Sequence, residues 1–336
     1  MPFNCKSRLP AISTSSPGRA LLVVFSLLPV AVMALEPPKP VRAVTTVGMI
    51  RDVVANVGGD CAEVDALMGP GIDPHLYRAS AGDVRKLRNA DVIFYGGYSL
   101  EGKLGRIFGR LENRIPTVAV SEAAHEPDTL IAGGKGYAID PHLWMDASLW
   151  AGTVPVIADA LIKQQSHCRQ AIEANAADYK RQLEALDGWI DEAIATIPED
   201  HRYLVTAHDA FAYYGRAYAI NVVGIQGIST DSEAGVGDIR ATADKVAKTG
   251  VPAIFVESTI NPRTVEAVVN ATRERGHEVE VGGELYSDAM GAEGSPSGTY
   301  IGMLHANTRT VVEALGGETP PLPEALHPWA ENWGIR

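Results

Sequence analysis

The chain has 336 residues, which is enough for about two domains. Hydrophobic residues make up 46% and charged residues 21%, the balance of an ordinary globular protein. The formal net charge is −12, so the composition excludes nucleic acid and an anionic membrane as the main expected partner.

The first residues have the pattern of an export signal. Basic residues precede the apolar run Ala20–Ala34, and no acidic residue occurs before Glu36. This order is typical of a signal peptide, with cleavage expected after Ala34, and the run is short for a membrane span. We therefore expect residues 1–34 to be a signal peptide and the mature protein to be periplasmic; a retained anchor is the alternative.

Three cysteines constrain the export route. Cys5 precedes the apolar run, where it is badly placed for lipid attachment. Cys61 and Cys168 remain in the mature chain, and an exported protein can join two such residues in a disulfide. The sequence leaves open whether these two meet.

The expected elements alternate between strand and helix. Residues 35–43 read as a tether, after which we expect strands at 44–50, 91–97, 117–120, 203–208, 220–225 and 253–258. Ser80 and Asp83 form a capping-box pattern for a short helix after the first strand. Asn261 and Pro262 are typical of another helix start, with Gly276 at its end.

A stretch from Cys168 to Ile197 contains no proline and one glycine, and its apolar residues fall mostly at helical spacing. Such a helix would be about 45 Å long. The sequence therefore predicts an α/β fold of two lobes, each with a mainly parallel sheet, joined by one long helix. The expected boundaries are 44–166 for the first lobe, 167–197 for the connecting helix and 198–336 for the second lobe.

The tetrapeptide Asp-Pro-His-Leu occurs twice, at Asp73–Leu76 and Asp140–Leu143. Asp suits a helix N-cap and Pro the first helical position, so each His is expected to project from a first helical turn. Each copy also falls in an expected loop at the end of a strand. Two interpretations stay open, namely two helix starts or two halves of one metal site.

The other histidines are less distinctive. His208 closes an expected strand, where α/β sheets usually bind ligands; the alternative is that Asp209 caps a helix there and His208 is incidental. Asp288 follows an expected strand and is weak evidence alone. The role of His125 stays open, and His305 is expected to be a core or surface residue. Surface positions are expected for the rest: His167, His201, His277 and His327.

Several motifs together resemble one protein family. They are "MGPGIDPHLYRASAGDVRKLRNADVIFYGG", "DPHLWMD", "VTAHDAFAYYGRAY", "GISTDSEAG", "IFVESTINPRTV" and "LYSDAMG". From about residue 44 to 315 the chain resembles the TroA-like solute-binding proteins of bacterial manganese/zinc ABC importers.

The resemblance implies two lobes joined by a rigid helix, with a divalent metal ion held between them. Its four ligand positions correspond to His75 and His142 in the first lobe and to His208 and Asp288 in the second. It also implies a non-enzymatic, monomeric carrier of Mn²⁺ or Zn²⁺, with Fe²⁺ as a further candidate. The expected partner is an inner-membrane ABC permease.

Two features refine the resemblance. Position 208 is His, where some manganese-specific relatives have Glu. The loop before the second ligand contains a single histidine, His125. Both features favour the mixed manganese/zinc branch. Tyr98 and Ser99 depart from the pattern expected in relatives. Imidazole binds metal only when neutral, so loading is expected to weaken as pH falls through about 6.

A zinc-dependent hydrolase using the same His/Asp site is the main alternative. The sequence has no H-E-x-x-H element, and four protein ligands leave little room for a reactive water. Glu233 and Glu257 are the candidate bases, but a helix start and a strand end explain them more simply. No G-x-S-x-G element suggests a serine hydrolase, and a secondary role in adhesion stays open.

Overall fold

The computed structural model describes Met1 and residues 39–134 and 136–335. Apart from Met1, the expected signal peptide lies outside the described residues. Residues Lys39–Arg336 form one compact unit. Within the described part of the chain, no helix is long and apolar enough to cross a membrane.

The first lobe is built on a four-stranded parallel sheet with strand order β2-β1-β3-β4. Its strands are β1 (Val41–Thr45), β2 (Ala62–Ala66), β3 (Val92–Tyr95) and β4 (Thr117–Ala119). Its helices are α1 (Gly48–Gly58), α2 (Ala81–Asn89), α3 (Gly105–Leu111), α4 (Val120–Ala124), α5 (Ala147–Ala151) and α6 (Thr153–Gln164). The expected capping box of Ser80 and Asp83 opens α2.

The first strand differs from the prediction at both ends. It begins at Val41, inside the expected tether, because Val41 and Ala43 are buried and pair with β2. It ends at Thr45, and Gly48 begins α1 where the prediction continued the strand to Ile50. The apolar residues that follow recur at helical spacing and bury one face of α1, which explains the early change of structure.

The second lobe contains two parallel strand pairs, β5 with β6 and β7 with β8. The strands are β5 (Tyr203–His208), β6 (Asn221–Gln226), β7 (Ala253–Glu257) and β8 (Glu280–Leu285). The helices are α8 (Ala212–Ala217), α9 (Val236–Thr249), α10 (Arg263–Arg273), α11 (Tyr300–Ala314) and α12 (His327–Asn332). Helix α10 starts where Asn261 and Pro262 predict it but ends before the turn that contains Gly276.

Short 3₁₀ helices connect these elements. They are η1 (Gly59–Cys61), η2 (Pro127–Thr129), η3 (Leu143–Met145), η4 (Ser166–Cys168), η5 (Glu199–His201), η6 (Pro296–Gly298) and η7 (Glu324–Leu326).

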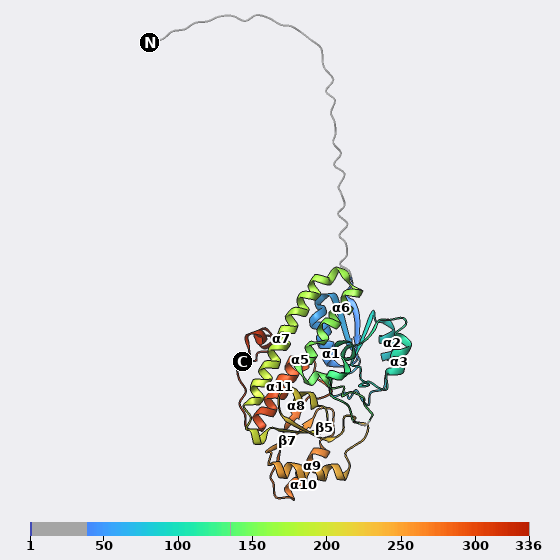
Figure 1. The fold of residues 1–336 in the computed structure, drawn as a ribbon. Coiled ribbons are helices and arrows are strands. Elements are labelled where there is room, and N and C mark those ends of the chain that lie inside the picture. Colours follow the sequence, from blue (N-terminus) through green and yellow to red (C-terminus); the bar gives the residue numbers. More distant parts are fainter. Residues whose placement is uncertain (2–38, 135, 336) are drawn as a thin grey trace, which may run out of the picture. The chain divides into compact units, whose positions relative to one another are not determined.

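The long helix α7 (Arg169–Ala195) passes alongside both lobes (Figure 1). It packs against α1, α5 and α6 of the first lobe and against α11 of the second. Its buried face includes Ile172, Leu183 and Ile190, which follow the predicted helical spacing. The structure therefore confirms the α/β class, with two lobes joined by one long helix.

A disulfide between Cys61 and Cys168 connects the end of η1 to the residue that precedes α7. The two cysteines are separated by 107 residues in the sequence. The bond therefore ties the amino end of the connecting helix to the first lobe, next to the start of β2.

Replacing Cys61 with Ser and Cys168 with Ala should lower the free energy of unfolding by about 2–5 kcal/mol, because a long loop in the unfolded chain is no longer closed. Denaturant titration with and without reductant measures this change. Reductant should destabilise the wild type and leave the double variant unchanged. A wild type that is insensitive to reductant would show that the bond contributes no stability.

Candidate metal centre

Three of the four predicted ligand residues lie at or after the carboxyl end of a parallel strand, and the fourth, His142, is separated from β4 by α4 and η2. His75 lies in the loop between β2 and α2, and His142 immediately precedes η3. His208 is the last residue of β5, and Asp288 lies in the loop after β8. The carboxyl ends of parallel strands are where α/β sheets place ligand-binding groups, because the connecting loops converge there.

Neither Asp-Pro-His element begins an α-helix, so that part of the sequence interpretation is wrong. The carboxylate of Asp73 accepts a hydrogen bond from the backbone N–H of His75 at 2.8 Å, and Asp140 accepts one from His142 at 2.9 Å. These Asx turns are short-range alternatives to a helix cap. Each turn fixes the backbone of its histidine without requiring a helix.

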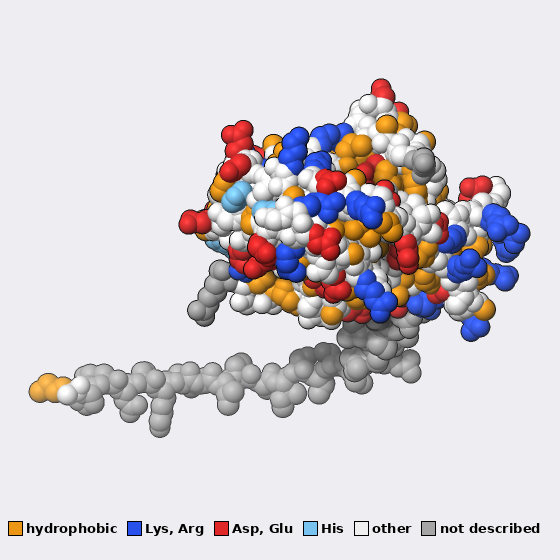
Figure 2. Space-filling model, turned by 90° about the horizontal axis from the view of Figure 1, so that it is seen from below, with side chains coloured by type: hydrophobic (Ala, Val, Ile, Leu, Met, Phe, Trp, Pro, Cys, Tyr) orange, Lys and Arg blue, Asp and Glu red, His pale blue; other side chains and the backbone are white. Residues whose placement is uncertain are grey.

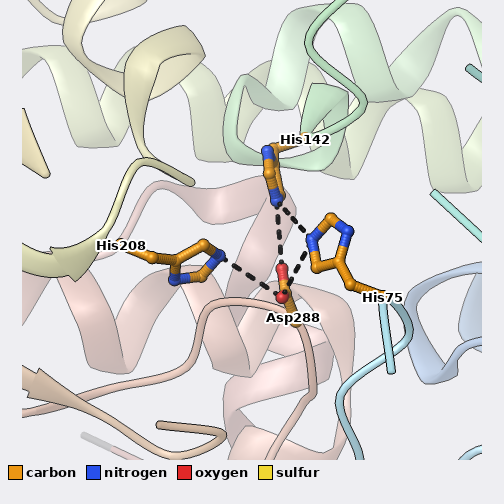
Figure 3. A group of neighbouring side chains, drawn as sticks. All are labelled: His75, His142, His208 and Asp288. Atoms are coloured by element: carbon orange, nitrogen blue, oxygen red, sulfur yellow. Dashed lines mark hydrogen bonds and ion pairs between the residues drawn. The ribbon is translucent and has the colours of Figure 1, made fainter. Parts of the chain in front are cut away.

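The structure brings the four side chains together (Figure 3). Their donor atoms all lie within 4.8 Å of one another. Nε2 of His75 is 3.4 Å from Oδ2 of Asp288, and Nε2 of His208 is 3.3 Å from the same oxygen. Nε2 of His142 is 3.3 Å from Oδ1 of Asp288 and 3.3 Å from Nε2 of His75.

These separations match those around a small divalent cation. Zn²⁺ holds nitrogen and oxygen ligands at about 2.0–2.1 Å, which places tetrahedral ligands about 3.3 Å apart. The contacts of the three imidazoles with the carboxylate, and the contact between His75 and His142, therefore fit a four-coordinate site.

The cluster is almost completely buried, with exposed fractions of 3% for His75, 0% for His142 and His208, and 1% for Asp288. Nε2 of His208 and both carboxylate oxygens of Asp288 have no hydrogen-bond partner. Burying a charged group without a partner is strongly unfavourable. A cation at the centre of the cluster would satisfy these atoms together.

A second layer of polar groups orients the rings. Nδ1 of His142 lies 2.7 Å from Asp140, and Nδ1 of His208 lies 2.5 Å from Glu257. Nδ1 of His75 lies 2.8 Å from the hydroxyl of Tyr137. When Nδ1 donates to these oxygens, the lone pair of Nε2 faces the centre of the cluster, the tautomer that a metal ligand needs.

Glu257 adjoins the candidate metal centre; the sequence interpretation considered it as a candidate base and preferred to explain it as a strand end. It is the last residue of β7, it is buried, and its second carboxylate oxygen accepts the backbone N–H of His208 at 2.8 Å. Its position at the carboxyl end of a strand was the available signal. Tyr137 gave no such signal, because its place beside His75 depends on a loop.

Further contacts connect the two lobes around the cluster. The hydroxyl of Thr230 donates to Asp73 at 2.6 Å, and Lys103 forms an ion pair with Asp231 at 2.8 Å. The indole N–H of Trp144 donates to the backbone oxygen of Ser287 at 2.9 Å. The loops that carry His75 and His142 are therefore bonded directly to loops of the opposite lobe.

The acidic groups change the protonation of the cluster. Burial by itself lowers the pKa of His142, but the charge of Asp140, its hydrogen bond with Nδ1 and the charge of Asp288 outweigh burial and raise this pKa to about 9. Burial likewise opposes the shift at His208, whose pKa Glu257 and Asp288 raise well above the ordinary value. Burial raises the pKa of Asp288, but the neighbouring histidines hold it well below its usual range.

Protons therefore compete with a cation for the imidazoles at a higher pH than the reference pKa of histidine suggests. The expected onset near pH 6 moves upward, because His142 retains its proton to about pH 9.

The remaining histidines lie outside the cluster. Nε2 of His125 is 2.8 Å from the backbone oxygen of Leu149, which gives it a structural role. His305 is buried and stacks on Trp189 with ring centroids 5.0 Å apart. His167 and His327 are exposed as expected, whereas two others are half-buried and lie within hydrogen-bond distance of backbone oxygens: His201 and His277.

The two unusual residues of the first lobe form a strained turn. Tyr98 and Ser99 have φ angles of 47° and 64°, which are uncommon for residues other than glycine. The backbone N–H of Tyr98 donates to Glu122, and its hydroxyl donates to the backbone oxygen of His125. This turn therefore packs against the segment before the second ligand and takes no direct part in the cluster.

Comparison with known proteins gives a consistent result. The family model described as zinc-uptake complex component A, periplasmic (ZnuA), matches residues 43–314. The manganese-binding lipoprotein MntA of Bacillus subtilis (strain 168) is 43% identical over 274 residues, 82% of this chain and 89% of MntA. The zinc-binding protein TroA of Treponema pallidum (strain Nichols) is 44% identical over 272 residues, 81% of this chain and 88% of TroA.

The solved structure of the periplasmic zinc binding protein TroA from Treponema pallidum matches with a TM-score of 0.80 at 43% identity. It covers 82% of this chain and 99% of that chain. The fold and the buried ligand cluster thus define a two-lobe solute-binding protein with a helical connection. The chain belongs to the ZnuA family of metal-binding solute-binding proteins of ABC transporters, which confirms the TroA-like resemblance.

The pKa of His142 predicts how stability depends on pH after chelation of metal. Its folded pKa of about 9 lies above the reference value of about 6.5. The imidazolium therefore stabilises the fold fully below pH 6.5, and this stabilisation is lost as pH rises toward 9. We expect the melting temperature of the chelated protein to fall between pH 7 and 9.

Thermal unfolding in the presence of chelator tests this expectation. Asp288→Asn is the matched variant, because it removes the buried charge that favours the imidazolium, and its melting temperature should depend less on pH. A wild-type melting temperature that is constant or rises over this range would contradict the assignment.

Proposed function

We propose that this protein captures a divalent metal ion, Mn²⁺ or Zn²⁺, between its two lobes and delivers it to an ABC importer. The ligands are His75, His142, His208 and Asp288. The single observation that carries the proposal is the buried cluster with contacts of 3.3–3.4 Å around an unpartnered carboxylate. The relatives named for manganese or zinc support the same class of cargo.

Three neutral imidazoles and one carboxylate form a ligand set with a net charge of −1. Such nitrogen-rich sites bind Zn²⁺ more tightly than Mn²⁺ in solution, according to the Irving–Williams order. The carboxylate supplies the harder ligand that Mn²⁺ and Fe²⁺ favour. Selection of cargo then depends on metal availability and on which ion completes the contacts between the lobes.

Each lobe contributes two ligands, so a bound ion bridges the lobes. We propose 44–166 and 198–336 as the two metal-binding lobes and 167–197 as the connection. Because α7 packs against both lobes, opening should be a small movement rather than a wide hinge.

The proposed location is the periplasm, and the proposed partner is an inner-membrane permease with its ATPase. The relative FimA of Streptococcus parasanguinis is named a metal ABC transporter substrate-binding lipoprotein and is 30% identical over 82% of this chain. The disulfide also suits an oxidising compartment. We propose that the mature protein acts as a monomer after removal of residues 1–34.

The same geometry argues against a hydrolase. Four protein ligands fill a tetrahedral site and leave no position for a reactive water. Glu257, the carboxylate beside His208, is occupied by two contacts to that residue and is buried. We therefore propose a non-enzymatic role.

The first test is the metal content of the stripped protein after dialysis against equal Mn²⁺ and Zn²⁺. The wild type should retain about one equivalent, and a metal concentration 100-fold above Kd should raise its free energy of unfolding by about 2.7 kcal/mol. His208→Ala should lose most of the bound metal and most of the gain in the free energy of unfolding, because it removes one of four ligands.

Exposed His167 provides the matched control, and His167→Ala should behave as the wild type. Absence of stoichiometric metal from the wild type, or full retention by His208→Ala, would reject the ligand assignment.

Glu257→Gln tests the second layer. With its oxygen toward the backbone N–H of His208, the Gln amide would donate to Nδ1 and place the ring proton on Nε2, which then cannot bind metal. Metal affinity should fall about 10–100-fold. Glu101→Gln is the control, because Glu101 is also a buried carboxylate but bonds Thr46 and Gly96 instead. Isothermal titration calorimetry measures the metal affinity of each variant, which should fall for Glu257→Gln and stay at the wild-type value for Glu101→Gln. Equal affinities of the two variants would contradict the tautomer argument.

A further inference from the structure

A basic surface interrupts an otherwise acidic protein. Residues 78–114 contain eight Lys or Arg and four Asp or Glu, whereas the whole chain has a formal charge of −12. Lys and Arg side chains gather on the part of the molecule that projects at the right of Figure 2, the side on which α2 and α3 lie in Figure 1. We call this surface the basic face and define it by its exposed arginines: Arg78, Arg85, Arg88, Arg106, Arg110 and Arg114.

The side chains of these six arginines are unpaired among the described residues. Within residues 39–134 and 136–335, none of them forms an ion pair or a side-chain hydrogen bond. Other described arginines mostly contact a carboxylate or a backbone oxygen, as Arg42, Arg202 and Arg275 do. Across the described second lobe, only Arg240 and Arg263 have side chains that are similarly unpaired.

The acidic residues of the same segment do not neutralise the basic face. Asp83 is used in the capping box of α2, Asp91 pairs with Arg42, and Glu101 is buried. Glu112 is the one exposed acid of the segment without an ion pair among the described residues. The positive charge of the arginines is therefore available to a partner.

Three of the arginines line one hollow together with Asn89 and several apolar side chains. Arg85 and Arg88 come from α2, and Arg114 follows α3; the apolar side chains include Val84, Leu111 and Ile115. Guanidinium groups bind carboxylates through two parallel hydrogen bonds, which an ammonium group cannot do. Arginine supplies six of the eight basic residues in the segment, so the composition favours specific contacts with carboxylates.

The basic face adjoins the candidate metal centre. Helix α2 follows the loop that carries His75, and Lys103, which precedes α3, pairs with Asp231 of the opposite lobe at 2.8 Å. A partner seated on the basic face therefore contacts the two helices that follow directly from the His75 loop and from the Lys103–Asp231 contact between the lobes.

We infer that the basic face docks on an acidic surface of the permease of the importer. This inference rests on the proposed function and adds the surface and the chemistry of its partner. An anionic bilayer is less suitable, because it would repel the acidic remainder of the chain and attracts lysine as well as arginine. Arginine is also enriched at protein–protein interfaces, where lysine is depleted.

Metal uptake by cells that lack the chromosomal copy of this protein tests the inference. The triple variant Arg85→Glu/Arg88→Glu/Arg114→Glu should lower uptake of radiolabelled Zn²⁺ or Mn²⁺ at least about tenfold, because like charges oppose docking. The triple Arg→Gln variant should have an intermediate effect on uptake. It controls for misfolding of the charge-reversal variant, because it removes the three charges without adding opposite ones. The purified variants should retain wild-type metal stoichiometry.

Arg240→Glu/Arg263→Glu is the matched control, because it reverses two exposed and unpaired arginines of the second lobe; its uptake should equal that of the wild type. Equal uptake by the triple variant would overturn the docking surface while leaving the carrier function intact. A wild type that neither binds metal nor restores uptake would instead reject the proposed function.

Sedimentation with phosphatidylglycerol vesicles provides the second measurement, with phosphatidylcholine vesicles as reference. The wild type should bind neither. Binding to phosphatidylglycerol that is lost in the triple variant would assign the basic face to the bilayer and overturn the inference.

Discussion

One buried carboxylate imposes the main physical constraint on this structure. Asp288 has both oxygens inside the protein without a hydrogen-bond donor, and three imidazole nitrogens face it at short range. A charge in this environment is stable only with positive charge beside it. Protons on the histidines or a divalent cation can supply that charge, so the same four groups respond both to pH and to metal.

Specific contacts hold the histidines in the orientation in which their ring nitrogens can take either a proton or a metal ion. Asp140 and Glu257 each accept from a ring nitrogen and from the backbone N–H of the same histidine, so each fixes both the ring and the loop. Trp144 and Thr230 then bond loops of one lobe to the other. The site is therefore part of the interface between the lobes, and any change in its occupant acts on that interface.

Much of the fold could be predicted from local patterns. The strand 203–208 has the predicted bounds, and the capping box of Ser80 and the long apolar periodicity of α7 each depend on residues close in sequence. The prediction was wrong where a local pattern was ambiguous. Val44–Ile50 is apolar enough for a strand, yet β1 pairs with β2 only as far as Thr45. The residues from Gly48 onward form α1, whose apolar face is buried. The expected helix starts at both Asp-Pro-His elements became Asx turns for a similar reason, because tertiary contacts decide how the chain continues after the turn.

The sequence by itself determined the alternation of strands and helices, the backbone hydrogen bonds by which Asp73 and Asp140 hold His75 and His142, and the family to which the chain belongs. These properties depend on short-range chemistry and on motifs whose order is preserved along the chain. Only the tertiary structure decided that Cys61 meets Cys168, that Glu257 orients His208 and that Tyr137 faces His75. Each of these pairs residues from distant segments, and their separation in space is set by how sheets and loops pack, which no local pattern records.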